Sequence, residues 1–271
     1  MRLSRTRIGV ALVLLLVLLA LVGPYLAPHS AADFVGTPNT GPAPGLPLGT
    51  DYLGQDVWSR FLAGGRGLLA IAAISTAIGL VVGVGIGLVA AYARNALDDV
   101  LMRALDVILA FPQIMLALVA VAVVGPQNWV IVTAIAVTTV PRVARVTRAA
   151  AQPVVERDFV AAAEAIGMSR THILVGELLP NILSPLLVEA SLRLTYSIGV
   201  IASLAFLGLS ADPNGADWGV MIQQNRIALS VQPWGVVTPI LAIALLTMGT
   251  GLVGDGISRA AAGIDRGRDE T

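Results

Sequence analysis

Few residues in this chain could carry chemistry. Cysteine and lysine are both absent, and all 17 basic residues are arginines. The lack of cysteine excludes disulfides, thiolate nucleophiles and cysteine-based metal sites. The lack of lysine excludes the phosphate-binding lysine of a P-loop and the amine of a Schiff base. The chain is therefore not an ordinary P-loop ATPase, and no catalytic residue is predicted.

Some ionisable residues do occur in or beside apolar segments. Glu189 and Arg193 are four residues apart, so they can pair on one face of a helix. Charges within a membrane mark functional sites by default, and a neutralised packing pair is an equally weighted alternative. Arg103 and Asp106, three residues apart, are predicted to form a structural pair rather than a gate.

The elements that position these residues are predicted to be membrane helices. The chain is 56% hydrophobic and 13% charged, whereas soluble domains carry about 25% charged residues. A spanning helix needs about 20 mainly apolar residues. Six segments meet this requirement: 8–27, 67–92, 105–124, 127–147, 180–207 and 232–254. The fold class is therefore an all-α integral membrane protein with six transmembrane helices. The net charge of zero gives no argument for a nucleic-acid partner.

The arginines are distributed unevenly around these segments, and positive residues favour the cytoplasmic side of a membrane. Arg60, Arg66 and Arg226 lie on one side, and Arg193 falls inside the fifth segment. The other side holds thirteen: Arg2, Arg5, Arg7, Arg94, Arg103, Arg142, Arg145, Arg148, Arg157, Arg170, Arg259, Arg266 and Arg268. This bias predicts a multi-pass protein with both termini in the cytoplasm, in the bilayer of a plasma membrane.

Two long segments are predicted on the outer side. Residues 28–66 begin rich in Pro and Gly, which is typical of an irregular strap rather than a domain. Residues 208–231 contain DPNGADWG, a turn cluster followed by a short helix. Asp212, Asp217 and Trp218 lie in this segment, where an external protein could dock. A plain turn with a tryptophan at the membrane interface is the alternative.

The second apolar segment carries glycines at a spacing of four. Gly79, Gly83 and Gly87 form two overlapping small-xxx-small motifs. Such a row makes a smooth groove on one helix face, where another helix can approach closely. The pattern predicts close helix packing, either within this chain or with another; the alternative is that glycine is simply common in membrane helices.

Residues 157–185, RDFVAAAEAIGMSRTHILVGELLPNILSP, are too polar to span a membrane. The sequence predicts a short amphipathic helix that starts near Pro153 and ends at Gly167. Its expected apolar face consists of Val155, Phe159, Ala162 and Ile166. Ser169 is expected to cap a second helix leading into the next span. The many alanines favour docking on a protein groove over binding to lipid.

This stretch resembles the cytoplasmic coupling loop of bacterial ABC-importer permeases. The family pattern is Glu-Ala-Ala, three residues, Gly, nine residues, then Ile-x-Leu-Pro. With Gly167 as the anchor, Leu179 and Pro180 match the end of the pattern. Ala161 stands where the family has Glu, and Glu177 stands where it has Ile. The missing carboxylate leaves Glu164, one turn further on, as a substitute.

Other motifs, in order along the chain, are similar to those of the C-type permeases of dipeptide and oligopeptide importers. Ile201 departs from the pattern, because relatives often carry a carboxylate just before the Ala-Ser-Leu run. The matching stretches are LGTDYLGQDVWSRFLAGGR (48–66), DDVLMRALDVILAFPQIMLALV (98–119), VPRVARVTR (140–148), PNILSP (180–185), SLAFLGL (203–209), DWG (217–219) and GDG (254–256).

The resemblance implies a type I importer permease fold and a set of partners. A homologous second permease would complete the translocation path, an external binding protein would deliver substrate, and one or two kinds of P-loop ATPase subunit would bind ATP and Mg²⁺. This chain would bind no cofactor. The residues implied in ATPase coupling are Asp158, Phe159, Ala161, Ala162, Ala163, Glu164, Gly167, Leu179 and Pro180.

The expected organisation has three parts: residues 1–66, a permease core over 67–256 with a coupling loop at 149–179, and a cytoplasmic tail over 257–271.

Two other functions are alternatives that the sequence supports less well. A self-sufficient secondary transporter would need more ionisable residues in its spans. An intramembrane hydrolase would need a base beside its nucleophile, but His29 and His172 are predicted on opposite sides of the membrane. Peptides are the implied substrates, with nickel chelates and haem as alternatives within the family.

Overall fold

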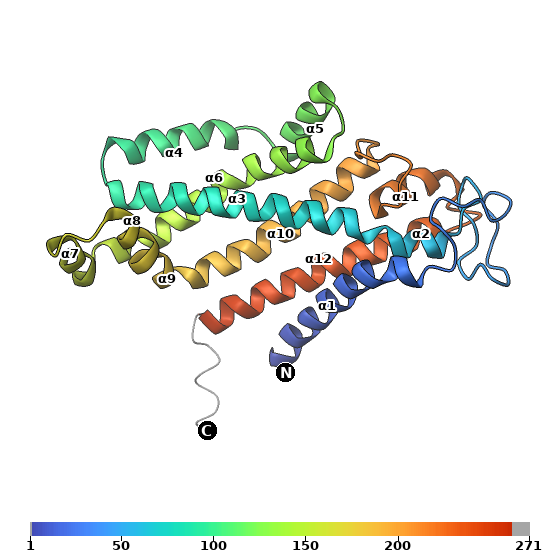
Figure 1. Ribbon diagram of the computed structural model, residues 1–271, viewed down its shortest axis with the longest axis horizontal. Helices are drawn as coiled ribbons and strands as arrows, with labels where there is room; N and C mark the ends of the chain where they lie inside the picture. The colour runs from blue at the N-terminus through green and yellow to red at the C-terminus, as the bar shows by residue number, and fades with distance from the viewer. Residues whose placement is uncertain (1, 262–271) are drawn as a thin grey trace.

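The computed structural model describes residues 2–261, so Arg266 and Arg268 and the end of the predicted tail lie outside the described residues. Long helices lie roughly along one axis, with short helices at both ends (Figure 1). In chain order the α-helices are α1 (Arg2–Leu26), α2 (Val57–Ala63), α3 (Gly65–Ala93), α4 (Ala96–Leu109), α5 (Gln113–Val124), α6 (Asn128–Val155), α7 (Asp158–Ala165), α8 (Arg170–His172), α9 (Leu179–Asn181), α10 (Leu183–Phe206), α11 (Trp218–Asn225) and α12 (Trp234–Ala261). A π-helix (Ile173–Leu178) joins α8 to α9, and a 3₁₀ turn (Arg226–Ala228) follows α11.

Five of these helices, α1, α3, α6, α10 and α12, are long and apolar enough to cross a membrane. The predicted span 105–124 is wrong as a single helix, because α4 and α5 meet there at a bend of 75°. Pro112 explains the break: it has no amide hydrogen to donate, and it disfavours helical backbone at Phe111. The bent pair passes the same test only when its two helices are taken together.

The glycine row of α3 packs against α6 in the same chain. Gly79 and Gly83 lie against Thr139 and Val143, and a Cβ atom added at either glycine would come within 2.7 Å of those side chains. At Gly87 the same atom would lie 2.5 Å from the carbonyl oxygen of Ala144. All three glycines are buried. The groove predicted from the spacing is thus filled by α6, and α3 and α6 form the central pair of the bundle.

Gly83→Ala is expected to lower the melting temperature of the purified protein in detergent. Val143 and the carbonyl oxygen of Val140, 2.9 Å from the added methyl group, would have to move, and overpacking of this kind costs about 1–3 kcal/mol. Gly85→Ala is the matched control, since nothing lies within 4 Å of that position. Equal melting temperatures for the two variants would contradict the close packing of α3 on α6.

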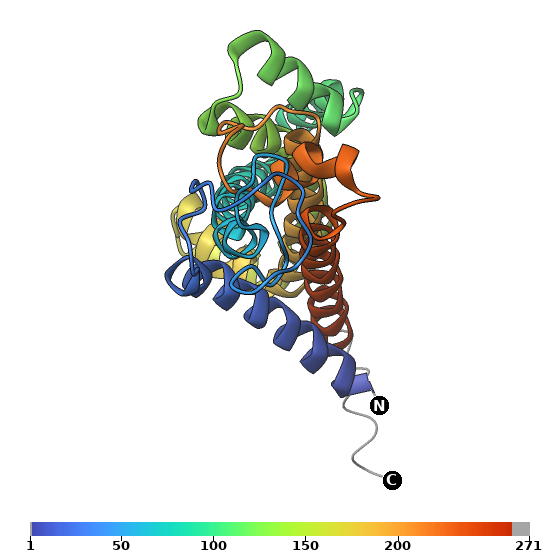
Figure 2. The same cartoon turned by 90° about the vertical axis from the view of Figure 1, so that its right-hand side faces the viewer.

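The two ends of the bundle differ in structure. One end holds α7, α8 and α9, and the other holds α2, α11 and the irregular strap, residues 28–56 (Figure 1). The strap folds over the ends of the long helices (Figure 2). The sequence predicted an irregular segment over residues 28–66. The last part of that segment instead forms helix α2, which is capped by Asp56. Helix α1 packs along α12, and Arg259 donates to the Thr6 hydroxyl at 3.4 Å, so the start of α1 and the end of α12 are neighbours.

Candidate functional site

The short helix α7 lies beyond the end of α6, separated from it by Glu156 and Arg157. The sequence predicted one helix that started near Pro153, and this is wrong. Pro153 belongs to the last turn of α6, and Arg157 adopts extended backbone (φ −77°, ψ 146°) before α7 begins at Asp158. The carboxylate of Asp158 in the first turn favours a helix start, because the amino end of a helix dipole is positive.

Gly167 ends α7 as the sequence predicted. Its φ of +77° is left-handed, a conformation that glycine adopts without steric penalty. The amide of Gly167 donates to the carbonyl of Glu164 at 3.0 Å, and the amide of Met168 donates to the carbonyl of Ala163 at 3.0 Å. These two bonds make a Schellman motif, which satisfies carbonyls that the helix end leaves free. The chain then turns sharply back toward the bundle.

Three residues of the predicted apolar face, Phe159, Ala162 and Ile166, are exposed on or just after α7, whereas Val155 belongs to the end of α6. Val160 and Ala163 are the buried residues of α7, and they pack on Leu88, Ile173 and Leu178 of the same chain. The break at residues 156–157 separates Val155 from the rest of the predicted face. Because Ala163 is only 6% exposed, its side chain cannot enter a groove on another protein.

The outward face of α7 consequently carries large apolar side chains. Phe159 is 39% exposed, and Ile166, just after the helix, is 73% exposed. Ala161 and Ala162 are exposed between them, as are Asp158 and Glu164. A hollow of about 460 Å³ lies beside this face and is lined by Val154, Arg157, Asp158, Phe159 and Asn181. We call the exposed residues Asp158, Phe159, Ala161, Ala162 and Ile166 the outer face of α7.

Two polar contacts tie this region to the end of α3. The Tyr92 hydroxyl donates to the Glu164 carboxylate at 2.6 Å, and Arg94 lies 3.6 Å from Glu156. Glu164 was predicted to replace the family's missing glutamate, but its carboxylate is bonded within its own chain. The contact links α7 to the end of α3.

If the chain is part of an ATP-driven importer, as the resemblance of this loop implies, Tyr92→Phe is expected to reduce uptake several-fold while it leaves ATP hydrolysis by the assembled complex within about twofold of normal. The variant removes one hydrogen bond to a charged acceptor, a loss of about 1.5–3 kcal/mol, and keeps the ring packed. The ratio of substrate imported to ATP hydrolysed checks this in reconstituted vesicles. An unchanged ratio would mean that the bond does not transmit movement.

The segment after Gly167 leads back into the bundle. The Ser169 hydroxyl accepts a hydrogen bond from the His172 amide at 3.3 Å, so the predicted cap is confirmed. The chain then passes through the π-helix, whose buried Ile173 and Leu178 hold it against α7. Leu179 is half-buried and Pro180 is exposed. They start the short helix α9, which is separated from α10 by a break at Ile182.

The ionic pairs inside the bundle differ in part from prediction. Glu189 and Arg193 of α10 lie 2.8 Å apart and are almost buried, as their spacing indicated. Asp106, however, pairs with Arg145 of α6 and not with Arg103. Tertiary packing of α4 on α6 explains the difference, because it brings Arg145 of the neighbouring helix next to Asp106 at the surface. Arg148 of α6 likewise donates two hydrogen bonds, at 2.5 and 2.6 Å, to Asp98 at the start of α4.

Trp218 does not lie on an outer docking surface. It is fully buried, stacks on Phe61, and donates from its indole nitrogen to the carbonyl of Phe61 at 2.9 Å. Asp217 caps α11, accepting from the amides of Gly219 and Val220 at 2.8 and 3.2 Å. Burial raises the pKa of Asp217, and these hydrogen bonds oppose the rise. Only Asp212 of the three predicted docking residues is well exposed.

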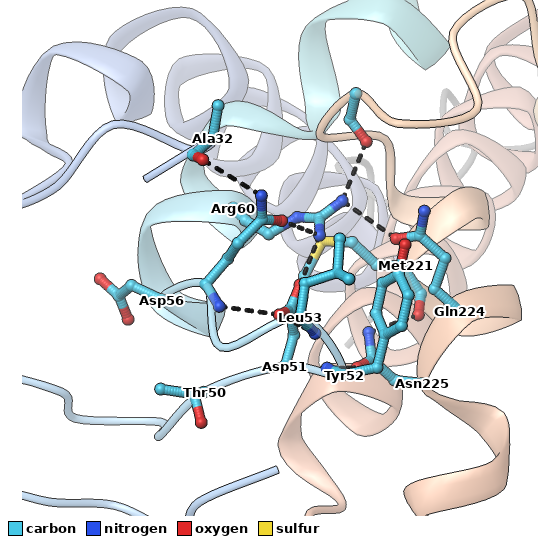
Figure 3. A network of polar contacts seen from close by, with 12 residues as sticks. Ala32, Thr50, Asp51, Tyr52, Leu53, Asp56, Arg60, Met221, Gln224 and Asn225 are labelled. Carbon is cyan, nitrogen blue, oxygen red and sulfur yellow. Dashed lines mark hydrogen bonds and ion pairs between the residues drawn. The ribbon is translucent and has the colours of Figure 1, made fainter. Parts of the chain in front are cut away.

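A buried polar network at the same end was missed by the sequence analysis. Arg60 of α2 is 1% exposed, and its guanidinium pairs with Asp51 and Gln55 of the strap (Figure 3). The same group donates to the carbonyl of Gly215 at 3.1 Å and to the Gln224 side chain at 3.0 Å. The strap is thereby fixed to both α2 and α11. The sequence did contain a hint of this network, because Arg60 interrupts the mostly apolar run VWSRFLA. The positive-inside analysis included Arg60 only as a charge in an outer loop.

Comparisons with known proteins agree with this architecture. Residues 83–262 match the model of the family described as "Binding-protein-dependent transport system inner membrane component". The chain is 35% identical to the glutathione transport system permease protein GsiD of Pectobacterium atrosepticum, over 96% of this chain and 88% of the relative. It is 36% identical to the di/tripeptide transport system permease protein DppC of Pseudomonas aeruginosa, over 93% of this chain and 86% of that relative. Among solved structures, a chain of the MetNI methionine ABC transporter in an inward-facing conformation superposes with a TM-score of 0.59 at 21% identity, covering 74% of this chain and 95% of that one.

The chain belongs to the family of inner membrane components of binding-protein-dependent transport systems. It is a membrane permease subunit of an ABC importer, and ATP hydrolysis belongs to a separate subunit. The bundle of α3 to α6 and α10 to α12 is accordingly a permease bundle, and α7 occupies the position of the loop identified by its sequence pattern.

Proposed function

We propose that this subunit imports peptides and that α7 is its coupling helix. The outer face of α7 is the observation that carries the proposal. Phe159 on α7 and Ile166 just after it are both exposed to solvent. The opposite face of α7 is held against the bundle by the buried residues Val160 and Ala163. A rigid helix with an apolar outward face suits a groove on a partner protein. The partner is a P-loop ATPase subunit, which binds ATP and Mg²⁺.

The remaining arrangement follows from the charge distribution. The end of the molecule with α7 holds Arg94, Arg157 and Arg170, and the start of α1 holds Arg5 and Arg7. The positive-inside rule places this end and both termini in the cytoplasm. The α4–α5 pair then counts as one bent span, which gives six spans. The strap and α11 face outward, where a substrate-binding protein delivers its cargo, and a second permease completes the path.

Peptides are the substrates that the similarity to peptide and glutathione permeases supports. The experiment is uptake into vesicles that contain the complete complex and its binding protein, with labelled trialanine, glutathione, a nickel chelate and haem offered separately at equal concentration. ATP-dependent uptake of trialanine or glutathione supports the proposal. ATP-dependent uptake of only the nickel chelate or haem would replace the substrate class but keep the importer, and uptake without ATP would contradict the ATPase-coupled mechanism.

A further inference from the structure

The contacts between helices fix the depth of the charged residues in the bundle. Gly79 is the central residue of α3, and Gly83 lies against Val143 of α6. Since a helix rises 1.5 Å per residue, Arg142 lies about 4.5 Å along the axis from the middle of α3. The arginine count put Arg142 on the cytoplasmic side, although it also falls within the predicted segment 127–147. The register places it within the spanning region.

Arg193 lies at a similar depth on α10. Thr76 of α3 donates to the Ser197 hydroxyl at 3.0 Å, which sets these two residues at one level. Arg193 precedes Ser197 by four residues and is therefore about 6 Å closer to the α7 end, near the level of Gly79. Helices α6 and α10 pack against each other, so Arg142 and Arg193 lie at similar depths on neighbouring helices.

The positive charge at this depth is only partly compensated. Arg193 lies 2.8 Å from Glu189, but the two groups are misaligned, and Arg193 Nε and Glu189 Oε1 have no correctly directed hydrogen-bond partner. Arg142 donates to the neutral amide of Gln113 at 3.1 Å. Within residues 2–261, no carboxylate lies within ion-pair distance of Arg142. At this depth the described residues thus place two cations, Arg142 and Arg193, but pair only Arg193 with an anion, Glu189.

The surface beside this cluster is open. The Arg193 guanidinium lies 5.0 Å from the centre of the Tyr196 ring, and Tyr196 is 57% exposed. Charged side chains in membrane proteins face a bundle interior or a water-filled cavity and avoid lipid. An exposed tyrosine next to Arg193 therefore marks the side of α10 that faces away from lipid.

We propose that Arg142 and Arg193 form a cationic station on the wall of the translocation path, which binds the carboxylate of a passing peptide. This rests on the proposed function, since a linear peptide carries a terminal carboxylate that is ionised at neutral pH. The positive charges of Arg142 and Arg193 are only partly compensated by Gln113 and Glu189, which suits transient binding of a carboxylate. A site along a conduction path must bind strongly enough to accept its cargo and weakly enough to release it.

The location and the sign of the field can be measured by cysteine labelling, because the chain has no cysteine of its own. Tyr196→Cys in the assembled complex is treated with a negatively charged and a positively charged methanethiosulfonate. After normalisation to a free thiol, the negative reagent is expected to react about five- to tenfold faster, since a potential of one or more kT attracts anions. Adding Arg142→Gln should remove most of this preference.

Leu15→Cys on α1 is the matched control, since Leu15 is 61% exposed but lies in an apolar helix face. It should react with neither charged reagent. If Tyr196→Cys were equally inert in the presence and absence of ATP, the residue would be covered by lipid or by the second permease, and the station would be overturned. A preference for the negative reagent that survives Arg142→Gln together with Arg193→Gln would overturn it as well.

Uptake tests the carboxylate itself. Trialanine and trialaninamide are supplied at concentrations that saturate the binding protein, as set by separate titrations. Arg142→Gln is expected to lower the uptake of trialanine about tenfold, the loss of one charge-assisted hydrogen bond, and to leave trialaninamide nearly unchanged. Arg103→Gln, which neutralises an exposed arginine on α4, should alter neither. If the wild-type complex imports neither of these peptides nor glutathione, the proposed function fails; if it imports both trialanine and trialaninamide and Arg142→Gln leaves their ratio unchanged, only the station fails.

Discussion

Gly167→Asp is expected to abolish uptake while the chain still inserts in the membrane at a normal level. The backbone at Gly167 is left-handed, with a φ of +77°, and nothing lies within 4 Å of an added Cβ atom. Aspartate tolerates this conformation better than most residues, so the cost to the fold is about 1–2 kcal/mol. The new carboxylate would project outward from the end of α7, into the interface proposed for the ATPase. The loss therefore reports a contact outside this chain.

Gly208→Asp is the matched control for strain. Gly208 also has a left-handed φ, of +82°, and open space around it, but it lies at the end of α10 away from α7. It should keep normal uptake. Uptake assays with immunoblots of membrane fractions check both variants. Normal uptake by Gly167→Asp at normal expression would contradict the assignment of α7 as the coupling helix.

Arg60→Ala is expected to have the largest effect on stability. It would leave Asp51 buried without its cation, and removal of one partner from a buried ion pair costs about 3–5 kcal/mol. Asp51 is fully buried and also accepts hydrogen bonds from the amides of Leu53 and Gln55. The variant should lower the melting temperature in detergent and expose the strap, residues 28–56, to limited proteolysis.

Arg226→Ala serves as the control, because Arg226 is exposed at the same end and donates to the carbonyl of Gln223, three residues before it. It should change neither measurement. The double variant Asp51→Asn with Arg60→Gln removes both charges together and should be less destabilising than the sum of its single variants. Additive effects of the two single changes would show that the pair is not coupled.

Much of the fold could be predicted from composition and spacing. Apolar length located α1, α3, α6, α10 and α12, and the glycine row of α3 predicted close packing. Pro112 shows where such reasoning stops, because a window of apolar residues continues through it while the helix does not. The bend of α4 on α5 depends on one missing amide hydrogen and not on hydrophobicity.

The local structure of the candidate site could be predicted only in part. Gly167 and Ser169 act through local hydrogen bonds, which a sequence can specify. The buried face of α7 depends on the phase of the helix after the break at residues 156–157, and on contacts with Leu88 and Leu178 that lie far away in the chain. Partners such as Arg145 for Asp106 and Asp51 for Arg60 likewise arise from tertiary packing, which spacing along one helix does not reveal.

Site-specific cross-linking from the outer face of α7 tests the central claim most directly. Phe159→Cys, in a chain that otherwise has no cysteine, is treated with a short thiol-to-amine cross-linker in native membranes, and the products are identified by mass spectrometry. The account predicts a product that joins this chain to a P-loop ATPase, whereas Val160→Cys, which is 1% exposed, gives none. If neither position joins an ATPase, in membranes where a known importer complex is captured in the same way, the coupling role of α7 is contradicted.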